Sequence, residues 1–321
     1  MERMDEFALI ANLFRPLARE NAGALALMDD AALLVPPSGC DLVFTKDMMI
    51  ADRHFFAEDA PDLIARKLLR VNLSDLAAMG AEPLGYLLGL AFAGRLDADL
   101  AGRFVTGLRQ DQERYGIALY GGDTVSGAGR LALSLTAIGS VPHGTALLRS
   151  GARPGDIVWV SGTIGDAALG LKALKGEIGR EMRLIDRYYL PEPRLALGKA
   201  LRGIATAAAD VSDGLIADLD HILEASGRAA RIHADRVPLS AEAARAIGGR
   251  RERLLDALTG GDDYELVFTA PADRHDRLWA VASETGTPLA PIGEILPGRG
   301  LDLIGPDGTK WPVTRGGFMH E

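Results

Sequence analysis

Aspartate is the residue type whose placement in this chain points most directly to chemistry. Most candidates follow an apolar run or stand beside glycine, in the stretches MDDAA, FTKDMMI, NLSD, YGGDT, DVSD and GGDDYEL. Aspartate also favours turns and caps, so any one of them alone is better explained as a turn, a cap or a solvated side chain. As a set, these carboxylates favour a site for a hard cation such as Mg²⁺, which prefers oxygen ligands.

Asp75 is the candidate whose position is hardest to explain without a ligand. The sequence predicts a helix over residues 61–79, and Asp75 falls within about 40° of the apolar face that carries Ile64, Leu68 and Val71. A charge on such a face is costly unless a basic partner, hydrogen bonds or a bound cation compensates it.

A second group of oxygen atoms is predicted on a strand. In the stretch LVFTKD, the two-residue period places Val43, Thr45 and Asp47 on one face. A hydroxyl and a carboxylate then point the same way, which suits Mg²⁺ completed by water and phosphate oxygens.

The composition fits a folded protein of about two domains, with 321 residues of which 48% are hydrophobic and 25% charged. The formal net charge is −9 and the basic residues are scattered, so nucleic acid is not an expected partner. Cys40 is the only cysteine, which excludes an intrachain disulfide and a thiolate metal site and fits a reducing compartment.

No membrane span or secretion signal is predicted. The longest apolar stretch, residues 86–93, is too short to cross a bilayer. The first residues, MERMDEFALIANLF, carry acids among apolar residues and predict an amphipathic helix, with no basic region before an apolar core. We therefore expect a cytoplasmic protein without a membrane partner.

Alternating strands and helices predict an α/β or α+β fold. A turn-rich stretch, RSGARPGD, divides the chain, and we expect domains over residues 1–145 and 146–321. The main predicted strands cover residues 41–45, 85–92 and 131–141, and the main helices residues 61–79 and 98–115.

Two patterns in the second half of the chain are weaker signals. The stretch IVWVSG predicts a strand and TIGDAALGLKAL a helix capped by Thr163, with a glycine turn that could cradle phosphate. The pair NLSD and GGD is echoed by DVSD and GGD at nearly the same spacing. This echo is either a coincidence among turn-forming residues or a similar acidic turn in each domain.

Several familiar site motifs are absent from the sequence. It contains no H-E-x-x-H, C-x-x-C, G-x-G-x-x-G or G-x-S-x-G, and no protein-kinase signature. No lysine is followed by serine or threonine, so a P-loop is impossible. A nucleotide would have to be held by glycine turns, helix N-termini and Mg²⁺.

Seven motifs, in order and over nearly the whole chain, carry a resemblance: DDAA, TKDMMIADRHF, NLSDLAAMGAEP, GGDT, LRSGARPGD, DVSDGL and GGDDYEL. Together they resemble the thiamine-monophosphate kinases of the aminoimidazole ribonucleotide synthetase-like superfamily. The resemblance implies a two-domain α/β (α+β) fold with mixed sheets and flanking helices. It also implies a homodimer paired through the N-terminal domains, with the ATP site between the N- and C-terminal domains.

The resemblance further implies a reaction and roles for individual residues. The γ-phosphoryl group of ATP would pass to thiamine monophosphate, giving thiamine diphosphate and ADP. The implied Mg²⁺ ligands are Asp30, Thr45, Lys46, Asp47, Asp75, Asp123, Asp210 and Asp213. The implied ATP contacts are Tyr115, Gly122, Asp123, Arg149 and Ser212, and the implied substrate contacts are His54, Asp262, Asp263 and Phe318.

Three positions depart from the pattern of the family. Lys46 stands where serine or threonine is common, so only its backbone carbonyl could bind metal. GGDD replaces the commoner GGED, and Phe318 stands where tryptophan or tyrosine is expected. An aromatic ring and acids would still suit a cationic aromatic substrate.

The implied chemistry needs no dedicated catalytic base. A phosphate monoester has a second pKa of about 6, so its attacking oxygen is already anionic at neutral pH. Mg²⁺ and Arg149 would offset the repulsion between two polyanions, and we expect direct transfer without a phosphoenzyme.

Purely structural interpretations of three of these residues stay open. His54 would by default be a half-buried structural histidine, Arg149 an ion-pair partner at the domain linker and Phe318 part of a frayed terminus. The alternative functions are an ATP-dependent synthetase of the same superfamily and a non-catalytic sensor of nucleotide or Mg²⁺.

Overall fold

A computed structural model describes residues 6–18, 21–94 and 97–312 of the chain. The chain folds into two compact units. The first comprises Met1–Leu76 and Glu82–Gly144, and the second Ala77–Ala81 and Thr145–Glu321.

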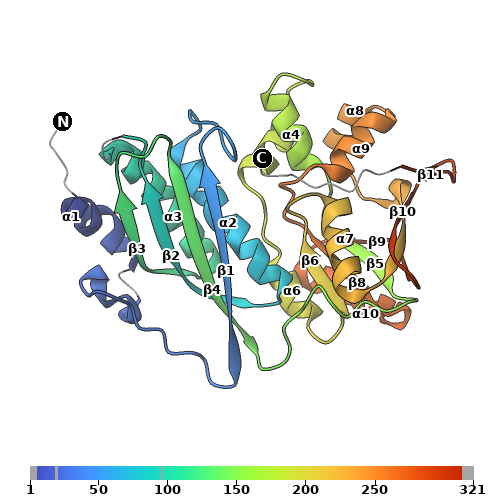
Figure 1. Ribbon diagram of the computed structural model, residues 1–321, viewed down its shortest axis with the longest axis horizontal. Helices are drawn as coiled ribbons and strands as arrows, with labels where there is room; N and C mark the ends of the chain where they lie inside the picture. The colour runs from blue at the N-terminus through green and yellow to red at the C-terminus, as the bar shows by residue number, and fades with distance from the viewer. Residues whose placement is uncertain (1–5, 19–20, 95–96, 313–321) are drawn as a thin grey trace. The chain divides into compact units, whose positions relative to one another are not determined.

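The first unit is built on a four-stranded sheet with the strand order β1-β4-β2-β3. Its strands are β1 (Cys40–Ile50), β2 (Glu82–Ala91), β3 (Ala118–Val125) and β4 (Ala132–Pro142). β4 is antiparallel to β1 and β2, and β2 and β3 are parallel, so the sheet is mixed (Figure 1). β1 and β3 are therefore the edge strands.

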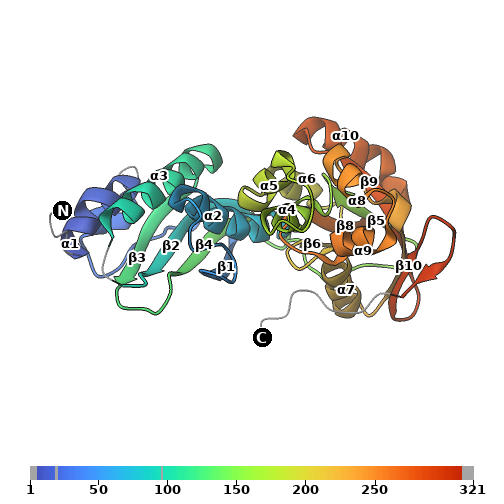
Figure 2. The same ribbon diagram turned by 90° about the horizontal axis from the view of Figure 1, so that it is seen from above.

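Two helices, α2 (Pro61–Ala78) and α3 (Ala98–Tyr115), cover one face of this sheet (Figure 2). α2 opens on a proline, which tolerates the first helical position because no backbone donor is needed there. Asp97 caps α3 by accepting from the N–H groups of Asp99 and Leu100, and Gly116 ends it in a left-handed conformation. Both predicted helices and all three predicted strands of this region are confirmed.

The N-terminal segment is less regular than predicted. Instead of one amphipathic helix, the described residues form α1 (Glu6–Leu9), a π-helical turn (Ile10–Phe14) and a 3₁₀ turn (Arg15–Ala18). The backbone stays helical at both junctions, and Pro16, which lacks an N–H, lies in the 3₁₀ turn. A further 3₁₀ stretch, Ala22–Leu27, begins at Asn21, whose side chain accepts from the Gly23 N–H.

The second unit contains a seven-stranded sheet of order β11-β10-β7-β9-β5-β8-β6. β10 runs parallel to β7, and the other neighbouring pairs are antiparallel. The strands are β5 (Ile157–Ser161), β6 (Ala207–Asp210), β7 (Ala229–His233), β8 (Leu266–Ala270), β9 (Leu289–Leu296), β10 (Gly300–Ile304) and β11 (Lys310–Trp311).

Both faces of this second sheet are covered, as the alternation along β5 shows. Val158 and Val160 belong to a core with α7 (Leu215–Ser226), whereas Trp159 belongs to a core with α6 (Leu195–Leu201) and α10 (His275–Thr285). A third cluster joins α4 (Asp166–Leu174), α5 (Met182–Tyr189), α8 (Ala241–Ile247) and α9 (Arg251–Thr259). Short 3₁₀ turns lie at Ala234–Arg236 and Ala272–Arg274.

The two-domain α/β fold with mixed sheets and flanking helices is thus confirmed. No helix within the described ranges has the length and apolar character needed to cross a bilayer. The sequence echo is not a structural repeat: Asp75 lies inside α2, whereas Asp213 lies in the turn between β6 and α7. The first GGD likewise lies inside β3, whereas the second lies in a loop, so the two pairs of motifs do not occupy equivalent positions.

Candidate functional site

The oxygen atoms predicted on one face of β1 meet the carboxylate of α2. The Thr45 hydroxyl donates a hydrogen bond to Asp75 Oδ2, and the Asp47 backbone N–H donates to the Asn72 side chain at 3.2 Å. Thr45, Asp47 and Asp75 are all half-buried. Sequence periodicity alone had placed Thr45 and Asp47 on one face, and the helix adds Asp75.

The electrostatics of this group favour a cation. Burial, and secondarily the negative charge of Asp75, raise the pKa of Asp47 to about 7. Both effects act against ionisation, so the two carboxylates resist being charged together. A hydroxyl and two carboxylates are also the hard oxygen donors that Mg²⁺ binds, so the group fits this ion chemically.

A second set of candidates lines a pocket of about 640 Å³ at the β3 edge of the same unit. Asp29, Asp30, Gly122 and Asp123 contribute to its wall, together with apolar side chains from the N-terminal segment and from β2 and β3. The backbone packs too closely at Gly122 for a side chain, because a Cβ atom there would lie 2.1 Å from the Leu88 carbonyl oxygen.

These two sets do not meet within one unit. β1 and β3 are separated by two strands, which corresponds to about 14 Å at the usual spacing. One row of residues paired across the four strands runs from Asp47 on β1 to Gly122 on β3. The next row runs from Met48 on β1 to Asp123 on β3. Neighbouring rows point to opposite faces, so Asp47 and Asp123 point away from each other.

The DVSD motif forms the turn between β6 and α7 in the second unit. Asp210 ends β6 and is buried, while Ser212 and Asp213 are half-buried. Asp218, which the sequence analysis did not single out, accepts from the N–H groups of Asp213 and Gly214 at 3.0 and 3.1 Å. Asp218 therefore fixes the conformation of the turn.

Charged groups gather around this turn. Ligand atoms of Asp213, Asp218 and His221 lie within 4.8 Å of one another, a spacing that could hold a metal ion. Burial, and then Asp213, raise the pKa of Asp218 to about 7, while Arg149 acts to lower it. Arg149 is exposed, and its backbone carbonyl accepts from the Ser226 hydroxyl.

The GGDDYEL motif is bound to the DVSD turn through its backbone. The N–H of Asp262 donates to the Ser212 carbonyl at 2.9 Å, and the N–H of Tyr264 donates to the Val211 carbonyl at 2.8 Å. Asp262 and Tyr264 both have left-handed backbone angles, with φ of 72° and 51°. Such conformations are strained for residues other than glycine and are often found at functional sites.

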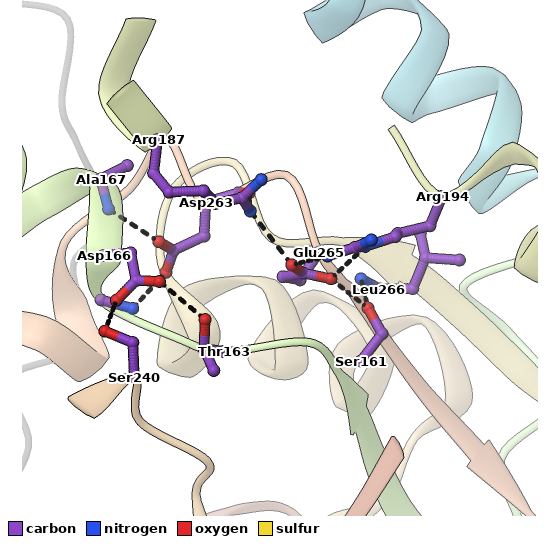
Figure 3. Close-up of polar contacts among 11 residues, drawn as sticks. Ser161, Thr163, Asp166, Ala167, Arg187, Arg194, Ser240, Asp263, Glu265 and Leu266 are labelled. Carbon is purple, nitrogen blue, oxygen red and sulfur yellow. Dashed lines mark hydrogen bonds and ion pairs between the residues drawn. The ribbon is translucent and has the colours of Figure 1, made fainter. Parts of the chain in front are cut away.

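Asp263 and Glu265 of the same motif are completely buried in a polar network (Figure 3). Asp263 accepts from the N–H groups of Gly165 and Ala167, at 2.6 and 3.1 Å, at the beginning of α4. Glu265 accepts from Ser161 Oγ and from the guanidinium groups of Arg187 and Arg194. These contacts give both acids structural roles.

The network corrects two predictions about α4. The helix begins at Asp166 with Gly165 as its N-cap, and Thr163 does not cap it but donates to Asp166 Oδ2 at 2.7 Å. The first N–H groups are bound by Asp263, so the glycine turn is not an open phosphate cradle. A carboxylate at a helix N-terminus is stabilised by those same donors.

The remaining candidates lie apart from these groups. Lys46 donates to Ser134 Oγ at 2.8 Å, and His54 accepts from the Ile50 N–H through Nδ1 at 3.1 Å. The Tyr115 ring lies beneath the guanidinium groups of Arg70 and Arg114, at 5.5 and 5.3 Å. Phe318 lies outside the described residues.

Sequence reasoning missed Asp218, Glu265 and the two arginines that bind Glu265. For Asp218, the signal was available: it lies five residues after Asp213, one helical turn into α7, where a carboxylate can bind the N–H groups of the preceding turn. For Glu265 there was no local signal, since Arg187 and Arg194 lie more than 70 residues away.

Comparisons with known proteins agree over the whole chain. The family described as AIR synthase related protein, N-terminal domain, matches residues 28–141, and its C-terminal domain matches residues 153–305. A thiamine-monophosphate kinase of Caulobacter vibrioides is 44% identical over 98% of this chain and 90% of its own length.

Solved structures give the same result. The crystal structure of thiamine-monophosphate kinase from Stenotrophomonas maltophilia has a TM-score of 0.85 and 42% identity, covering 95% of this chain and 97% of its own. The structure described as AaThiL complexed with AMPPCP and TMP has a TM-score of 0.76 and 29% identity, with 97% of each chain covered.

The two mixed-sheet units, with acids at strand ends and turns, thus define an AIR synthase related protein. Within that class, coverage of nearly the full length at 44% identity is decisive. The chain belongs to the thiamine-monophosphate kinase family.

Proposed function

We propose that this protein transfers the γ-phosphoryl group of ATP to thiamine monophosphate, forming thiamine diphosphate and ADP. The observation that carries the proposal is the group of Thr45, Asp47 and Asp75, in which two carboxylates and a hydroxyl gather where ionisation is disfavoured. A phosphotransferase needs such a group to hold the cations that accompany its phosphates. The family relationship supplies the substrate, because the relatives are thiamine-monophosphate kinases.

We propose the following metal and nucleotide contacts. Thr45, Asp47 and Asp75 would hold Mg²⁺, together with Asp30, Asp123, Asp210, Asp213 and the backbone carbonyl of Lys46. When bound, Mg²⁺ neutralises phosphate charge and orients oxygens. Arg149 would add positive charge beside the ATP phosphates, and Tyr115, Gly122 and Ser212 would contact the nucleotide.

The acceptor would be oriented from the GGDDY turn. Asp262 would attract the cationic ring system of thiamine, with His54 and Phe318 as further contacts. Asp263 has both oxygens occupied by the N–H groups of α4, so we assign it a supporting role and leave the substrate contact to Asp262. The acceptor phosphate is anionic at neutral pH, so these residues need only align it with ATP.

The first test is ADP release by the purified protein with ATP and Mg²⁺, comparing thiamine monophosphate, thiamine and no acceptor. We expect ADP and thiamine diphosphate only with the monophosphate. Nucleotide binding without acceptor-dependent turnover would favour a synthetase or sensor instead. A labelled phosphoprotein trapped during turnover would contradict direct transfer.

We also propose that the protein works as a homodimer. The face of the four-stranded sheet opposite α2 and α3 has no element over it in the described part of the chain (Figure 2). Phe44, Met48 and Val125 are 62%, 54% and 50% exposed, and Ile50 lies in the same register row as Val125. An apolar patch of this kind is typical of an interface between subunits.

A second copy would explain why Asp47 and Asp123 point apart. If two open faces pack about a two-fold axis that runs along the strands, β1 of one copy lies over β3 of the other. Asp123, which points from the open face, would then face β1 of the partner, the strand whose other face carries Thr45 and Asp47. A homodimer would thus place the two groups of oxygen atoms on neighbouring elements.

Mixing two inactive variants tests this composite site. Asp47→Asn and Asp123→Asn, carrying different tags, would be co-expressed and the mixed dimer purified. One native site forms in the mixed dimer if the acids come from different copies, and about half of the wild-type activity should return. If both acids serve a site within one chain, no activity returns.

For localisation, we propose the cytoplasm. The proposed co-substrate of the protein is ATP, and its single cysteine suits a reducing compartment.

A further inference from the structure

We propose that Arg187 is a positioning residue that fixes the GGDDY turn, and with it the carboxylate of Asp262. This inference rests on the proposed function, in which Asp262 contacts thiamine monophosphate. Arg187 lies on α5, far from the turn in the sequence, and it is not one of the residues that the motifs identify. It would act through the backbone of the turn, without touching the substrate.

The turn needs such support because its backbone is strained. Asp262 and Tyr264 both adopt positive φ angles, which cost free energy in residues that carry a Cβ atom. Gly261 packs so closely that a Cβ atom there would lie 2.2 Å from the Ser212 carbonyl oxygen. A strained conformation persists only when the surrounding structure holds it.

Arg187 supplies that support with one guanidinium nitrogen. Its Nη2 donates to the backbone carbonyl of Asp263 at 3.0 Å. It also donates to Glu265 Oε1 at 3.0 Å (Figure 3). Asp263 lies between the two strained residues, so this bond holds the centre of the turn from the side of α5. The Asp263 carboxylate, bound to the N–H groups of Gly165 and Ala167, ties the same residue to α4.

Arg194 provides a matched comparison within the same network. Its guanidinium group donates to both oxygens of Glu265. Its side chain is 18% exposed, close to the 16% of Arg187, and both face a Glu265 side chain that is 1% exposed. The two arginines therefore share the buried carboxylate, and the bond to the Asp263 carbonyl distinguishes Arg187.

The test compares Arg187→Gln, Arg187→Lys and Arg194→Gln in the full chain. For each variant, the KM values for thiamine monophosphate and for ATP would be measured, together with the melting temperature. Hydrogen exchange at the amides of Asp262 and Tyr264 would report directly on the turn, because these amides donate to Ser212 and Val211.

We expect both glutamine variants to lower the melting temperature, since each leaves Glu265 one guanidinium short. Arg187→Gln alone should raise the KM for thiamine monophosphate about tenfold, leave the KM for ATP within about twofold, and speed exchange at Asp262 and Tyr264. Arg187→Lys, which keeps a cationic donor, should recover part of this loss.

Equal KM values and equal exchange rates in Arg187→Gln and Arg194→Gln would overturn the inference and leave Arg187 a purely stabilising role. A KM for ATP that rises as much as that for the acceptor would also overturn it, because Arg187 would then act on the nucleotide. If the wild type shows no turnover with thiamine monophosphate, the proposed function fails, and exchange at the two amides still decides whether Arg187 fixes the turn.

Discussion

Two groups of buried or half-buried carboxylates, one in each unit, are surrounded very differently. In the first unit, Asp47 and Asp75 lie together beside Thr45, and both burial and Asp75 raise the pKa of Asp47. In the second unit, Glu265 is held by two guanidinium groups and a serine hydroxyl. The pKa of Asp263 is raised to about 8, because burial outweighs the opposing effects of two backbone N–H groups and Arg187.

The difference separates acids that are bound by basic groups and backbone donors from the acids for which we propose a metal ligand. A buried charge is tolerated when basic groups and hydrogen bonds surround it, as they do for Glu265. A buried carboxylate beside a second carboxylate is unfavourable in its charged form until a cation joins them. Residue type and position after an apolar run do not distinguish the two cases, whereas the neighbours do.

The largest expected effect is on activity, from Asp75→Asn. Removing this charge should lower kcat at least about a hundredfold, because a ligand to the cations that stabilise the transferred phosphoryl group is lost. The melting temperature should stay the same or rise, since a like-charge contact with Asp47 is relieved. ADP release at several Mg²⁺ concentrations and a thermal melt measure both. Wild-type turnover in this variant would contradict a role for Asp75 in binding the cations.

The largest expected effect on stability comes from Glu265→Gln. The variant leaves Arg187 and Arg194 facing each other without their shared carboxylate, and we expect a loss of about 3 kcal/mol in the free energy of unfolding. That loss corresponds to a melting temperature lower by roughly 6–12 °C. Thermal unfolding followed by circular dichroism would measure it, and an unchanged melt would show that the network is not stabilising.

The pH dependence of stability distinguishes the groups more finely. The pKa of Asp47 is about 7 in the folded chain and 3.8 in its unperturbed state, so the folded state binds the proton more tightly. Without Mg²⁺, the stability that this proton provides is complete below about pH 4 and is lost as the pH rises through 7. Asp47→Asn should flatten this part of the stability curve.

Mg²⁺ provides the control for that measurement. The cation binds the ionised carboxylates, so adding it at pH 8 should restore stability to the wild type and much less to Asp47→Asn. Melting temperatures from pH 5 to 8, with and without Mg²⁺, would show this. A wild-type curve that Mg²⁺ does not change would contradict a metal site at Asp47.

The smallest expected effect is at an exposed ion pair on α10. Arg277 Nη1 lies 2.9 Å from Glu284 Oε1, as close as Arg187 is to Glu265, but the two side chains are 50% and 55% exposed. Arg277→Ala should therefore change stability by less than about 0.5 kcal/mol. The melting temperatures of Arg277→Ala and Arg187→Gln, measured side by side, would show how strongly burial determines the contribution of an ion pair to stability at similar N–O distances. Equal losses would contradict the role of burial.

Much of the fold could be read from local patterns. The two-residue period of β1 predicted the shared face of Thr45 and Asp47, and the helical period predicted α2 with Asp75 toward its apolar side. The predicted helix over residues 98–115 is α3, which the Asp97 cap and Gly116 delimit in the structure. These features depend on residues within a few positions of one another, so the sequence alone contains the necessary information.

The N-terminal segment and the start of α4 could not be predicted in the same way. At α4, the expected local cap from Thr163 is replaced by Asp263, which lies 98 residues from Gly165. At the N-terminus, the described residues of the amphipathic segment are helical, but the hydrogen bonding changes from α to π and then to a 3₁₀ turn that contains Pro16, which lacks an N–H. In both places a competing contact or a missing donor outweighed local propensity.

By itself, the sequence determined the order of the acidic motifs, the family and the elements that carry each candidate residue. The tertiary contacts show that basic groups and backbone N–H groups surround Asp263 and Glu265, that Asp47 lies beside a second carboxylate, Asp75, and that Asp47 and Asp123 lie at opposite edges of one sheet. The physical reason is that a carboxylate's role depends on the charges and donors around it, which come from segments distant in the chain.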